Sequence, residues 1–503
     1  MLNLKTLALS AIACLGLSLT ATSQEQTAAT PTEQVHPAWT DFQPEFTLHV
    51  CPFHNAAPAY DPDEFICGYV LVPEDRTDPD SRLIQLSVLQ IKSTSETPEV
   101  PAIVRLTGGP GAPSLSAGRI SAYQAQWADE YRAAADLIFF DQRGVGYSEG
   151  HFCRAIPRSF QYGVATLPDG QDRLVENFRK CLAEARQKGI PIDAYSTWQN
   201  ALDVRDIRLA LGYDEWVLLG VSYGTALGQA VIDVDTEGTS AAIFDSVVPA
   251  TDPTNRTWNT AAGFRSALTA INEMCASNEA CARDVGEMAA RFIAVFEAYD
   301  AEPMIIEDMD PGAVLEGRIV MDGTLAASAV FQALYDHTLY PDFPSLLIAL
   351  ETRDKAALTA YAGRLGRSID HAAGNGLEIV ANCRGSAIES GQTLAQTAID
   401  EPILSGLVST VQWNDLCTRA YQIAPDPSVK PLITDVPVLV GAGLADPITP
   451  PSYSKSIMPG LANGQYVEVP YTGHGAFVSH FDGCGGDMML AFAKAPMEPV
   501  DTS

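Results

Sequence analysis

The chain has few basic residues for its size. It carries 31 Lys and Arg side chains against 62 Asp and Glu in 503 residues, which gives a formal net charge of −31. Phosphate backbones and anionic membrane surfaces would be repelled by such a surface, so nucleic acid is not expected as a partner. The acidic excess mainly indicates a well-solvated surface and says little about a reaction.

Several motifs that would indicate a metal, nucleotide or membrane function are missing. No Cys-x-x-Cys pair is accompanied by a second pair or a histidine cluster at zinc spacing, so no metal site is expected. The phosphate-binding patterns G-x-x-x-x-G-K-[S/T] and G-x-G-x-x-G are absent. Beyond the N-terminus, no apolar run is long enough for a transmembrane helix. We therefore expect neither a metal nor an organic cofactor.

The N-terminus has the pattern of an export signal. Lys5 is followed by the apolar run Leu7–Leu19 and a small-residue site at Ala21-x-Ser23, which predicts a signal peptide at 1–23. Residues 24–45, rich in Thr, Gln and Pro, are predicted to form a disordered leader. We expect a periplasmic or secreted protein. Cys14 lies in a sequence that loosely resembles a lipoprotein cleavage box, which makes lipid anchoring the less favoured alternative.

Cysteine usage fits an oxidising compartment. Nine cysteines follow Cys14, and pairing each with the next along the chain would leave Cys484 free. The pairing of Cys275 with Cys281 is the best supported, because only five residues separate the two, and the sequence alone does not establish the connectivity. The predicted pairs are Cys51–Cys67, Cys153–Cys181, Cys275–Cys281 and Cys383–Cys417.

Short apolar runs that end in turn signals predict β-strands from about residue 46 onward. The later runs, such as WVLLG and AAIFD, are continuous, which is typical of strands buried on both faces of a sheet. Helical segments lie between them, for example YSTWQNALDVRDIRLALGY before the strand at 215–222. Alternating strands and helices predict an α/β fold with a mostly parallel central sheet.

The pattern changes at about residue 251. From there to about 430 the sequence is largely helical, and two strand-like units then return, VPVLVGAGLADPITP and QYVEVPYTGHG. A helical insert in an α/β sheet is expected to cover the carboxyl edge of the strands, where ligands bind. We therefore divide the chain into a first core part at 46–250, a helical cap at 251–430 and a second core part at 431–503.

The pentapeptide Gly220-Val221-Ser222-Tyr223-Gly224 lies where a buried strand meets a helix. The pattern G-x-S-x-G is short, but its position between WVLLG and the helical TALGQAVI is typical of a nucleophile elbow. The flanking glycines would allow a strained turn that exposes the serine Oγ to substrate. Ser222 is therefore the predicted nucleophile, with an ordinary strand-to-helix turn as the alternative.

An acid and a histidine follow later in the chain, in the order that hydrolases of this architecture require. Asp446 lies after the first returning strand, and His474 lies between two glycines after the second. His480 is the nearest rival histidine, and Asp446 could instead cap its own turn. Placement favours Asp446 and His474 as the remaining members of a catalytic triad, and Asp435 and Asp482 are less well placed.

A loop rich in Gly and Pro, VRLTGGPGAPS at 104–114, directly follows a predicted strand. Glycines let backbone N–H groups approach a tetrahedral oxyanion closely. The predicted oxyanion donors are the N–H groups of Gly109 and of Tyr223, the residue after the nucleophile, and Gly108 is a candidate substrate contact. A plain turn would explain one Gly-Pro pair, but three glycines at this place favour a functional loop.

Three motifs occur together in this chain: TGGPG at 107–111, DQRGVGYS at 141–148 and GVSYGT at 220–225. Together they resemble the α/β-hydrolase peptidases of the proline iminopeptidase and tripeptidyl aminopeptidase family. The resemblance spans about residues 46–490. It implies a serine exopeptidase that removes N-terminal residues or short peptides, in which Asp141 and Arg143 brace the loops around the site.

The sequence departs from this family at two places. Thr107 stands where proline iminopeptidases usually have a histidine, so the secreted tripeptidyl branch is the closer match. The family's cap tends to carry an acid soon after a cysteine, which can hold the α-amino group of the substrate, whereas Arg384 and Gly385 follow Cys383. Glu389 is the first acid after them and a candidate ligand for that amine. Other acids of the insert leave the choice open, namely Glu273, Asp336 and Glu378.

These observations predict a secreted serine hydrolase that releases N-terminal residues or short peptides through an acyl-enzyme. Its partners would be peptides or small esters. A carboxylesterase acting on small or lipid-like esters with the same triad is the alternative. A non-catalytic binding protein that keeps the hydrolase fold is a remote one.

Overall fold

The computed structural model describes most of the chain. The signal peptide predicted at 1–23, Cys14 and Glu389 lie outside the described residues. The described residues belong to one compact unit, Glu33–Ser503. They are 34–53, 64–116, 129–153, 169–250, 258–307, 319–361, 376–385, 391–407, 413–422 and 424–502.

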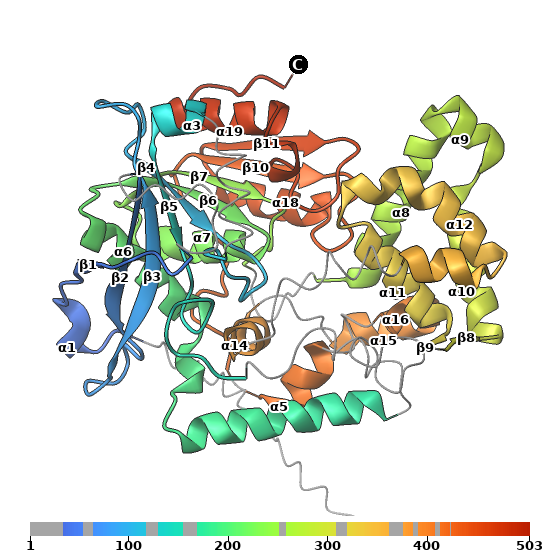
Figure 1. Cartoon of the computed structure of the whole chain (residues 1–503), viewed down its shortest axis with the longest axis horizontal. Coiled ribbons are helices and arrows are strands. Elements are labelled where there is room, and N and C mark those ends of the chain that lie inside the picture. Colours follow the sequence, from blue (N-terminus) through green and yellow to red (C-terminus); the bar gives the residue numbers. More distant parts are fainter. Residues whose placement is uncertain are drawn as a thin grey trace, which may run out of the picture. The chain divides into compact units, whose positions relative to one another are not determined.

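In the described part of the chain, nine strands form one central sheet (Figure 1). Strands β1 to β3 and β5 pair antiparallel, and the sheet from β5 to β11 is parallel. The predicted α/β fold with a mostly parallel sheet is confirmed. In sheet order the strands are β1 (Phe46–Leu48), β2 (Phe65–Pro73), β3 (Leu83–Ile91), β5 (Asp136–Phe140), β4 (Ala102–Leu106), β6 (Trp216–Val221), β7 (Thr239–Asp245), β10 (Val438–Gly443) and β11 (Gly464–Val469).

Side chains of the central strands alternate between two apolar layers. On β6, Leu218 belongs to one buried cluster, whereas Val217 and Leu219 belong to another, because successive side chains of a strand point to opposite faces. Both faces are therefore covered, which explains the continuous apolar runs. The first layer contains α5 (Gly170–Gln187), α6 (Thr197–Leu211), α7 (Tyr223–Val234) and α14 (Gly376–Arg384), and the second contains α3 (Asp129–Ala134) and α19 (Cys484–Lys494).

The stretch between β7 and β10 is mostly helical, as predicted. Helices α8, α10, α11 and α12 share an apolar cluster of their own. A small hairpin of β8 (Met304–Ile306) and β9 (Ile319–Met321) also lies here, which the sequence pattern does not predict. The helical elements are α8 (Thr260–Ser277), α9 (Glu279–Asp284), α10 (Met288–Ala301), α11 (Gly323–Ala333), η3 (His337–Asp342), α12 (Phe343–Glu351), α15 (Gly391–Asp400) and α16 (Pro402–Ser405).

One part of the predicted cap packs with the sheet instead of with this helical cluster. Leu377 of α14 and Leu416 of the π-helical turn η4 (Leu416–Ala420) lie in the apolar layer that α6 and α7 form on the sheet. The disulfide Cys383–Cys417 joins α14 to η4. The segment 251–430 is therefore not packed as a single helical body.

The described part of the predicted leader is ordered. Helix α1 (Pro37–Thr40) follows His36, whose backbone N–H donates to Arg76 O at 2.8 Å. Trp39 Nε1 donates to Asp78 O at 2.7 Å. Both acceptors lie just after β2, so residues 36–39 are tied to the sheet, and the prediction of disorder is wrong for this part of 24–45.

The four predicted disulfides are present. Cys484, exposed in the first turn of α19, is the free cysteine of the described residues. Four disulfides are consistent with an exported protein. Within the described ranges, no helix is both long enough and apolar enough to cross a membrane. The bonded pairs are Cys51–Cys67, Cys153–Cys181, Cys275–Cys281 and Cys383–Cys417.

Alkylation of the folded protein without reduction is expected to modify Cys484 alone among the described cysteines. Its thiol is exposed, whereas the other eight are held in disulfides and have no thiol to react. Peptide mass spectrometry would locate the label, with reduced and denatured protein as the control in which all of these cysteines react. Label on any of the other eight before reduction would contradict the pairing.

Candidate active site

Ser222 lies in a strained turn at the carboxyl end of β6. Its φ of 58° and ψ of −127° fall in a region that residues other than glycine rarely adopt. Its N–H donates to Asp245 O at 3.0 Å, and its carbonyl accepts from the N–H and the Oγ1 of Thr225 at 2.8 and 2.6 Å. These bonds hold the turn in place, so that α7 begins directly after the serine.

Gly220 and Gly224 are required by close packing. A Cβ on Gly220 would lie 2.5 Å from Gly224 O, and a Cβ on Gly224 would overlap Leu106 O at the end of β4. A side chain at Gly220 would push the end of β6 away from the start of α7, and a side chain at Gly224 would push α7 away from β4. The G-x-S-x-G pattern therefore reflects a turn that is pressed against β4.

The glycine-rich loop after β4 lies directly against the predicted nucleophile. A Cβ on Gly108 would lie 2.8 Å from Val221 O and 2.9 Å from Ser222 Cβ. Gly109 has a φ of 116°, which glycine adopts at little cost. Among the described backbone hydrogen bonds outside helices and strands, none has the N–H group of Gly109 or of Tyr223 as its donor. The role of these two N–H groups as oxyanion donors stays a prediction.

Asp446 and His474 meet, as the sequence predicts. Nδ1 of His474 lies 2.8 Å from Oδ2 of Asp446. The carboxylate is fully buried, and 15% of the histidine side chain is exposed. Burial acts against the charged form of both groups, but their mutual attraction and hydrogen bond outweigh it, so the pKa of His474 is raised and the pKa of Asp446 is lowered.

Thr449 completes this pair and is not predicted from the sequence. Its Oγ1 donates to Asp446 Oδ2 at 2.6 Å and lies 3.0 Å from His474 Nδ1. The backbone N–H groups of Ile448 and Thr449 donate to the other oxygen, Oδ1, at 3.0 and 2.9 Å. Asp446 thus caps its turn with one oxygen and binds the histidine with the other. Its role in a catalytic triad stays a prediction. The D-x-x-T spacing of Asp446 and Thr449 is the sequence pattern that could have indicated the contact between them.

The described hydrogen bonds include none between Ser222 Oγ and His474. The two residues are instead linked through the end of β7: Ser222 N–H donates to Asp245 O, and Gly475 N–H donates to Ser246 Oγ at 2.8 Å. Catalytic hydrogen bonds are often long in enzymes without substrate and shorten when it binds. The structure therefore brings two of the three predicted triad members into contact and joins the third to them through β7.

The region after α11 lies against the histidine loop. The ring of Tyr335 is 5.1 Å, centroid to centroid, from that of His474. The ring of His337 is 5.0 Å from that of His480, the rival histidine, which also lies 2.6 Å from Thr472 Oγ1 through its Nε2. His480 therefore has its own partners and does not contact Asp446. These aromatic residues of the predicted cap border the site.

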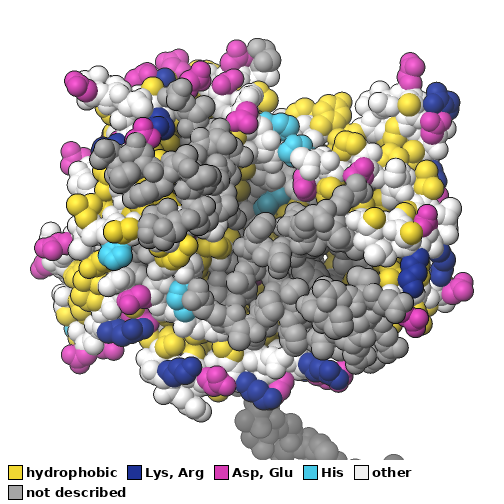
Figure 2. Space-filling model, viewed as in Figure 1, with side chains coloured by type: hydrophobic (Ala, Val, Ile, Leu, Met, Phe, Trp, Pro, Cys, Tyr) yellow, Lys and Arg dark blue, Asp and Glu magenta, His cyan; other side chains and the backbone are white. Residues whose placement is uncertain are grey.

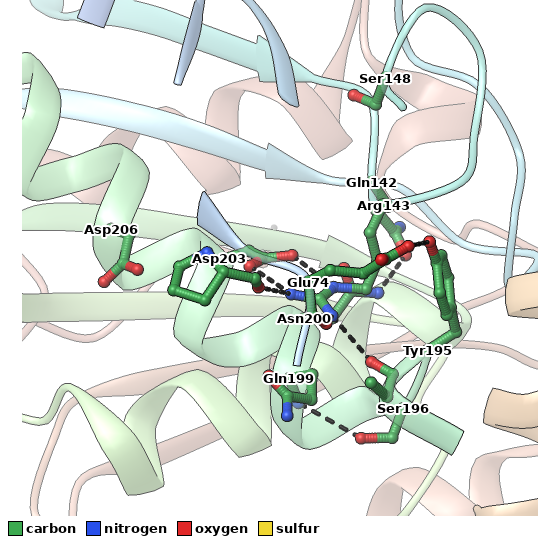
Figure 3. Close-up of polar contacts among 12 residues, drawn as sticks. Glu74, Gln142, Arg143, Ser148, Tyr195, Ser196, Gln199, Asn200, Asp203 and Asp206 are labelled. Atoms are coloured by element: carbon green, nitrogen blue, oxygen red, sulfur yellow. Dashed lines mark hydrogen bonds and ion pairs between the residues drawn. The ribbon is translucent and has the colours of Figure 1, made fainter. Parts of the chain in front are cut away.

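Asp141 and Gln142 join the glycine-rich loop to the DQRG loop. Asp141 Oδ1 accepts from the N–H groups of Ser114 and Leu115 at 2.6 and 3.1 Å. Gln142 Nε2 donates to Thr107 O at 2.8 Å, just before Gly108. This side chain in turn accepts from Asn200 Nδ2 on α6 at 2.9 Å (Figure 3). The loop that touches Ser222 is therefore fixed by buried polar contacts.

Arg143 lies at the centre of the same buried network (Figure 3). It forms a two-point ion pair with Asp203, with both N···O distances at 2.7 Å and both side chains fully buried. Its Nη1 also donates to the backbone carbonyls of Glu74 and Ala194 at 2.6 and 2.8 Å. These contacts fit the bracing role that the family resemblance implies for Asp141 and Arg143.

Two further predictions from the sequence concern a ligand for the substrate amine and a metal site. Glu389, the candidate for binding the substrate amine, lies at 386–390, outside the described residues. In the part of the chain that the structure describes, no group of three or more His, Cys, Asp or Glu side chains could hold a metal ion.

Replacing Asp446 with Asn should lower kcat by about 10⁴-fold, because the amide cannot hold the imidazole in the same tautomer. The acid limb of kcat/KM should also move to lower pH, since the Asp446 charge that raises the pKa of His474 is lost. Steady-state kinetics across pH would measure both effects. Asp435→Asn provides a matched control outside the predicted triad, and an Asp446→Asn variant with an unchanged acid limb would contradict the assignment.

Replacing Gly108 with Ala should impair catalysis, because the new methyl group would press on Ser222 and Val221. The overpacking should also destabilise the fold by about 1–3 kcal/mol. Gly483→Ala is a suitable control, because a Cβ there has only His480 O at 3.9 Å. Denaturant unfolding and kcat would be measured for both variants, and equal kcat for Gly108→Ala and the parent would contradict the close approach of this loop.

Comparison with known proteins supports the fold described above. Residues 101–268 match a family model described as the alpha/beta hydrolase fold, and residues 402–503 match one described as TAP-like protein. The chain is 32% identical to the tripeptidyl aminopeptidase of Streptomyces coelicolor over 195 residues, a match that spans 37% of this chain and only 36% of that protein. It is 26% identical to serine protease Hip1 of Mycobacterium tuberculosis over 419 residues, which are 80% of this chain and 75% of that protein.

Solved structures are more distant. The proline iminopeptidase of Mycobacterium smegmatis is 17% identical with a TM-score of 0.40, over 85% of this chain and 98% of that one. These values are low, so the fold is identified from the sheet order and the family models. The chain is an α/β-hydrolase-fold protein that resembles the serine peptidases of the proline iminopeptidase and tripeptidyl aminopeptidase family.

Proposed function

We propose that the protein is an exported serine exopeptidase that releases N-terminal residues or short peptides. The observation that carries the proposal is the hydrogen bond between His474 and the buried Asp446, beside the strained turn of Ser222. All three follow the carboxyl ends of strands in the parallel part of the sheet, which is where open α/β sheets bind ligands.

In the proposed mechanism, Ser222 Oγ attacks the carbonyl carbon of the substrate. His474 uses Nε2 to take the serine proton, because its Nδ1 is bonded to Asp446, and then gives that proton to the leaving amine. The N–H groups of Gly109 and Tyr223 stabilise the oxyanion. A water molecule, deprotonated by His474, then hydrolyses the acyl-enzyme and frees Ser222.

A peptide substrate is supported by the relatives, which are named tripeptidyl aminopeptidase and serine protease. A free amino terminus would bring a positive charge to the site. Acidic side chains are scattered over the visible face of the molecule (Figure 2), so the net charge of −31 does not oppose the approach of such a group. Glu389 remains one candidate ligand for the amine among the acids of the helical insert.

Export is supported by two independent features. The sequence at 1–23 has the pattern of a signal peptide, and eight of the described cysteines form disulfides, which persist in oxidising compartments. We propose that the protein acts in the periplasm or outside the cell.

A fluorophosphonate probe is expected to label the protein at Ser222, because the probe reacts with activated serines. Ser222→Ala should not be labelled and should lose activity, whereas Ser240→Ala, at the opposite end of β7 from Asp245, is a control that should keep both. Equal labelling of Ser222→Ala and the parent would disprove the nucleophile.

The same preparation distinguishes an exopeptidase from an esterase. We expect hydrolysis of tripeptidyl aminomethylcoumarins with a free N-terminus, and a loss of most of kcat/KM when that terminus is acetylated, because an uncharged amide cannot pair with a carboxylate. Equal turnover of free and acetylated peptides, or turnover of p-nitrophenyl esters alone, would reject the exopeptidase and favour the carboxylesterase.

A further inference from the structure

Asp245, the last residue of β7, contacts both halves of the site. Its side chain is fully buried, and its Oδ2 accepts hydrogen bonds from the backbone N–H groups of Phe477 and Val478, both at 3.0 Å. Its backbone carbonyl accepts from Ser222 N–H at 3.0 Å. One residue therefore holds the loop that carries His474 with its side chain and the Ser222 turn with its backbone.

The next residue, Ser246, extends this link. Its Oγ accepts from Gly475 N–H at 2.8 Å, directly after His474. Its own N–H donates to Gly441 O of β10 at 3.0 Å. Ser246 has a φ of 60°, a strained conformation for a non-glycine residue that the surrounding structure must hold. Three N–H groups that follow His474, at positions 475, 477 and 478, are thus fixed by the end of β7.

The Asp245 carboxylate is charged although its burial favours the neutral form. Burial raises the pKa of Asp245 to about 6, against the opposing effects of its two backbone hydrogen bonds, His474 and Arg105. Its charge in turn contributes to the raised pKa of His474. At pH 7 the Asp245 carboxylate is mostly ionised, and it gains a proton as the pH falls through about 6, whereas the pKa of His474 is raised above its ordinary value.

We propose that Asp245 is a positioning residue for the hydrolytic reaction, a second carboxylate that fixes the His474 loop against the Ser222 turn. Hydrogen bonds to an ionised acceptor are roughly twice as strong as those to a neutral one, so the two backbone bonds weaken when Asp245 is protonated. The charged groups that act on the carboxylate are His474, in the loop after β11, and Arg105 of β4. The inference rests on the proposed roles of Ser222 and His474.

The test is Asp245→Asn, which keeps an oxygen acceptor of the same shape but removes the charge. We expect kcat to fall by about tenfold, and by on the order of 10²-fold in Asp245→Ala, because a misplacement of 1 Å has about that effect. The acid limb of kcat/KM should move to lower pH and become shallower in Asp245→Asn, since one titrating group is gone and His474 loses a nearby negative charge.

Asp235→Asn is the matched control. Asp235 is also a buried carboxylate, paired with Arg208 by a bond of 2.7 Å, but it lies before β7 and therefore at the opposite end of the strand. It should lower the Tm without moving the acid limb. Ser246→Ala removes the bond to Gly475 and the 3.5 Å contact of Ser246 Oγ with Asp245 Oδ1, and it leaves every charge in place. It should lower kcat and move the acid limb less than Asp245→Asn does.

The outcomes separate this inference from the proposed function. If Ser222→Ala abolishes probe labelling while Asp245→Asn keeps the kcat and acid limb of the parent, the positioning role is wrong and the nucleophile stands. If Asp245→Asn loses kcat while its acid limb stays in place, Asp245 only supports the fold, and this result would also overturn the proposal. Asp245→Ala could fail to fold. In that case the kinetics of Asp245→Asn decide between these outcomes, provided that its Tm shows that it is folded.

Discussion

The buried charge of Asp446 is the constraint on which the rest of the site depends. An isolated carboxylate with no exposed surface would cost several kcal/mol, so every lone pair that faces the protein needs a donor. Asp446 has four donors: His474, the Thr449 hydroxyl and two backbone N–H groups. The turn at 446–449 and the loop of His474 must therefore be correctly folded at the same time, or the charge is left uncompensated.

Strand register brings those pieces together. On β10 and β11, Gly443 is opposite Val469. The loops that carry Asp446 and His474 therefore leave their strands at the same level of the sheet. On β6 and β7, Val221 is opposite Asp245, which places Ser222 level with Ser246. Because the strands are parallel, all of these loops leave the same edge. The site is thus a property of the sheet, and the loops supply only the last three to five residues.

Parts of this arrangement were predictable from the sequence, because local patterns determine them. Continuous apolar runs marked the strands, G-x-S-x-G between a strand and a helix marked the turn of Ser222, and an acid and a histidine after the next strands marked Asp446 and His474. Each of these signals lies within about ten residues of chain. The pairing of neighbouring cysteines, such as Cys383 with Cys417, was also correct, since chain proximity favours it.

The parts that were missed depend on contacts between distant segments. Asp245 binds N–H groups more than 230 positions away, as Phe477 and Val478 show, and no local pattern reports this. Leu377 of α14 looks like any apolar residue of a helical insert, yet it packs on the sheet. The hairpin β8–β9 has only three residues in each strand, too few for a periodic signal. Tertiary packing decides such features, and the sequence shows them only after the fold is known.

Several unfavourable local features lie at one edge of the sheet. Ser222, Ser246 and Tyr471 have positive φ values, and Asp446 and Asp245 carry charge where burial opposes it. Each feature lowers stability when taken alone, and each is held by hydrogen bonds or packing from neighbouring strands. The Arg143–Asp203 pair is equally buried, but there two opposite charges face each other and the guanidinium also donates to the backbone carbonyls of Glu74 and Ala194. Under the proposed function, strain at the edge is retained because it holds the partly buried Ser222 and the oriented His474 within reach of one substrate.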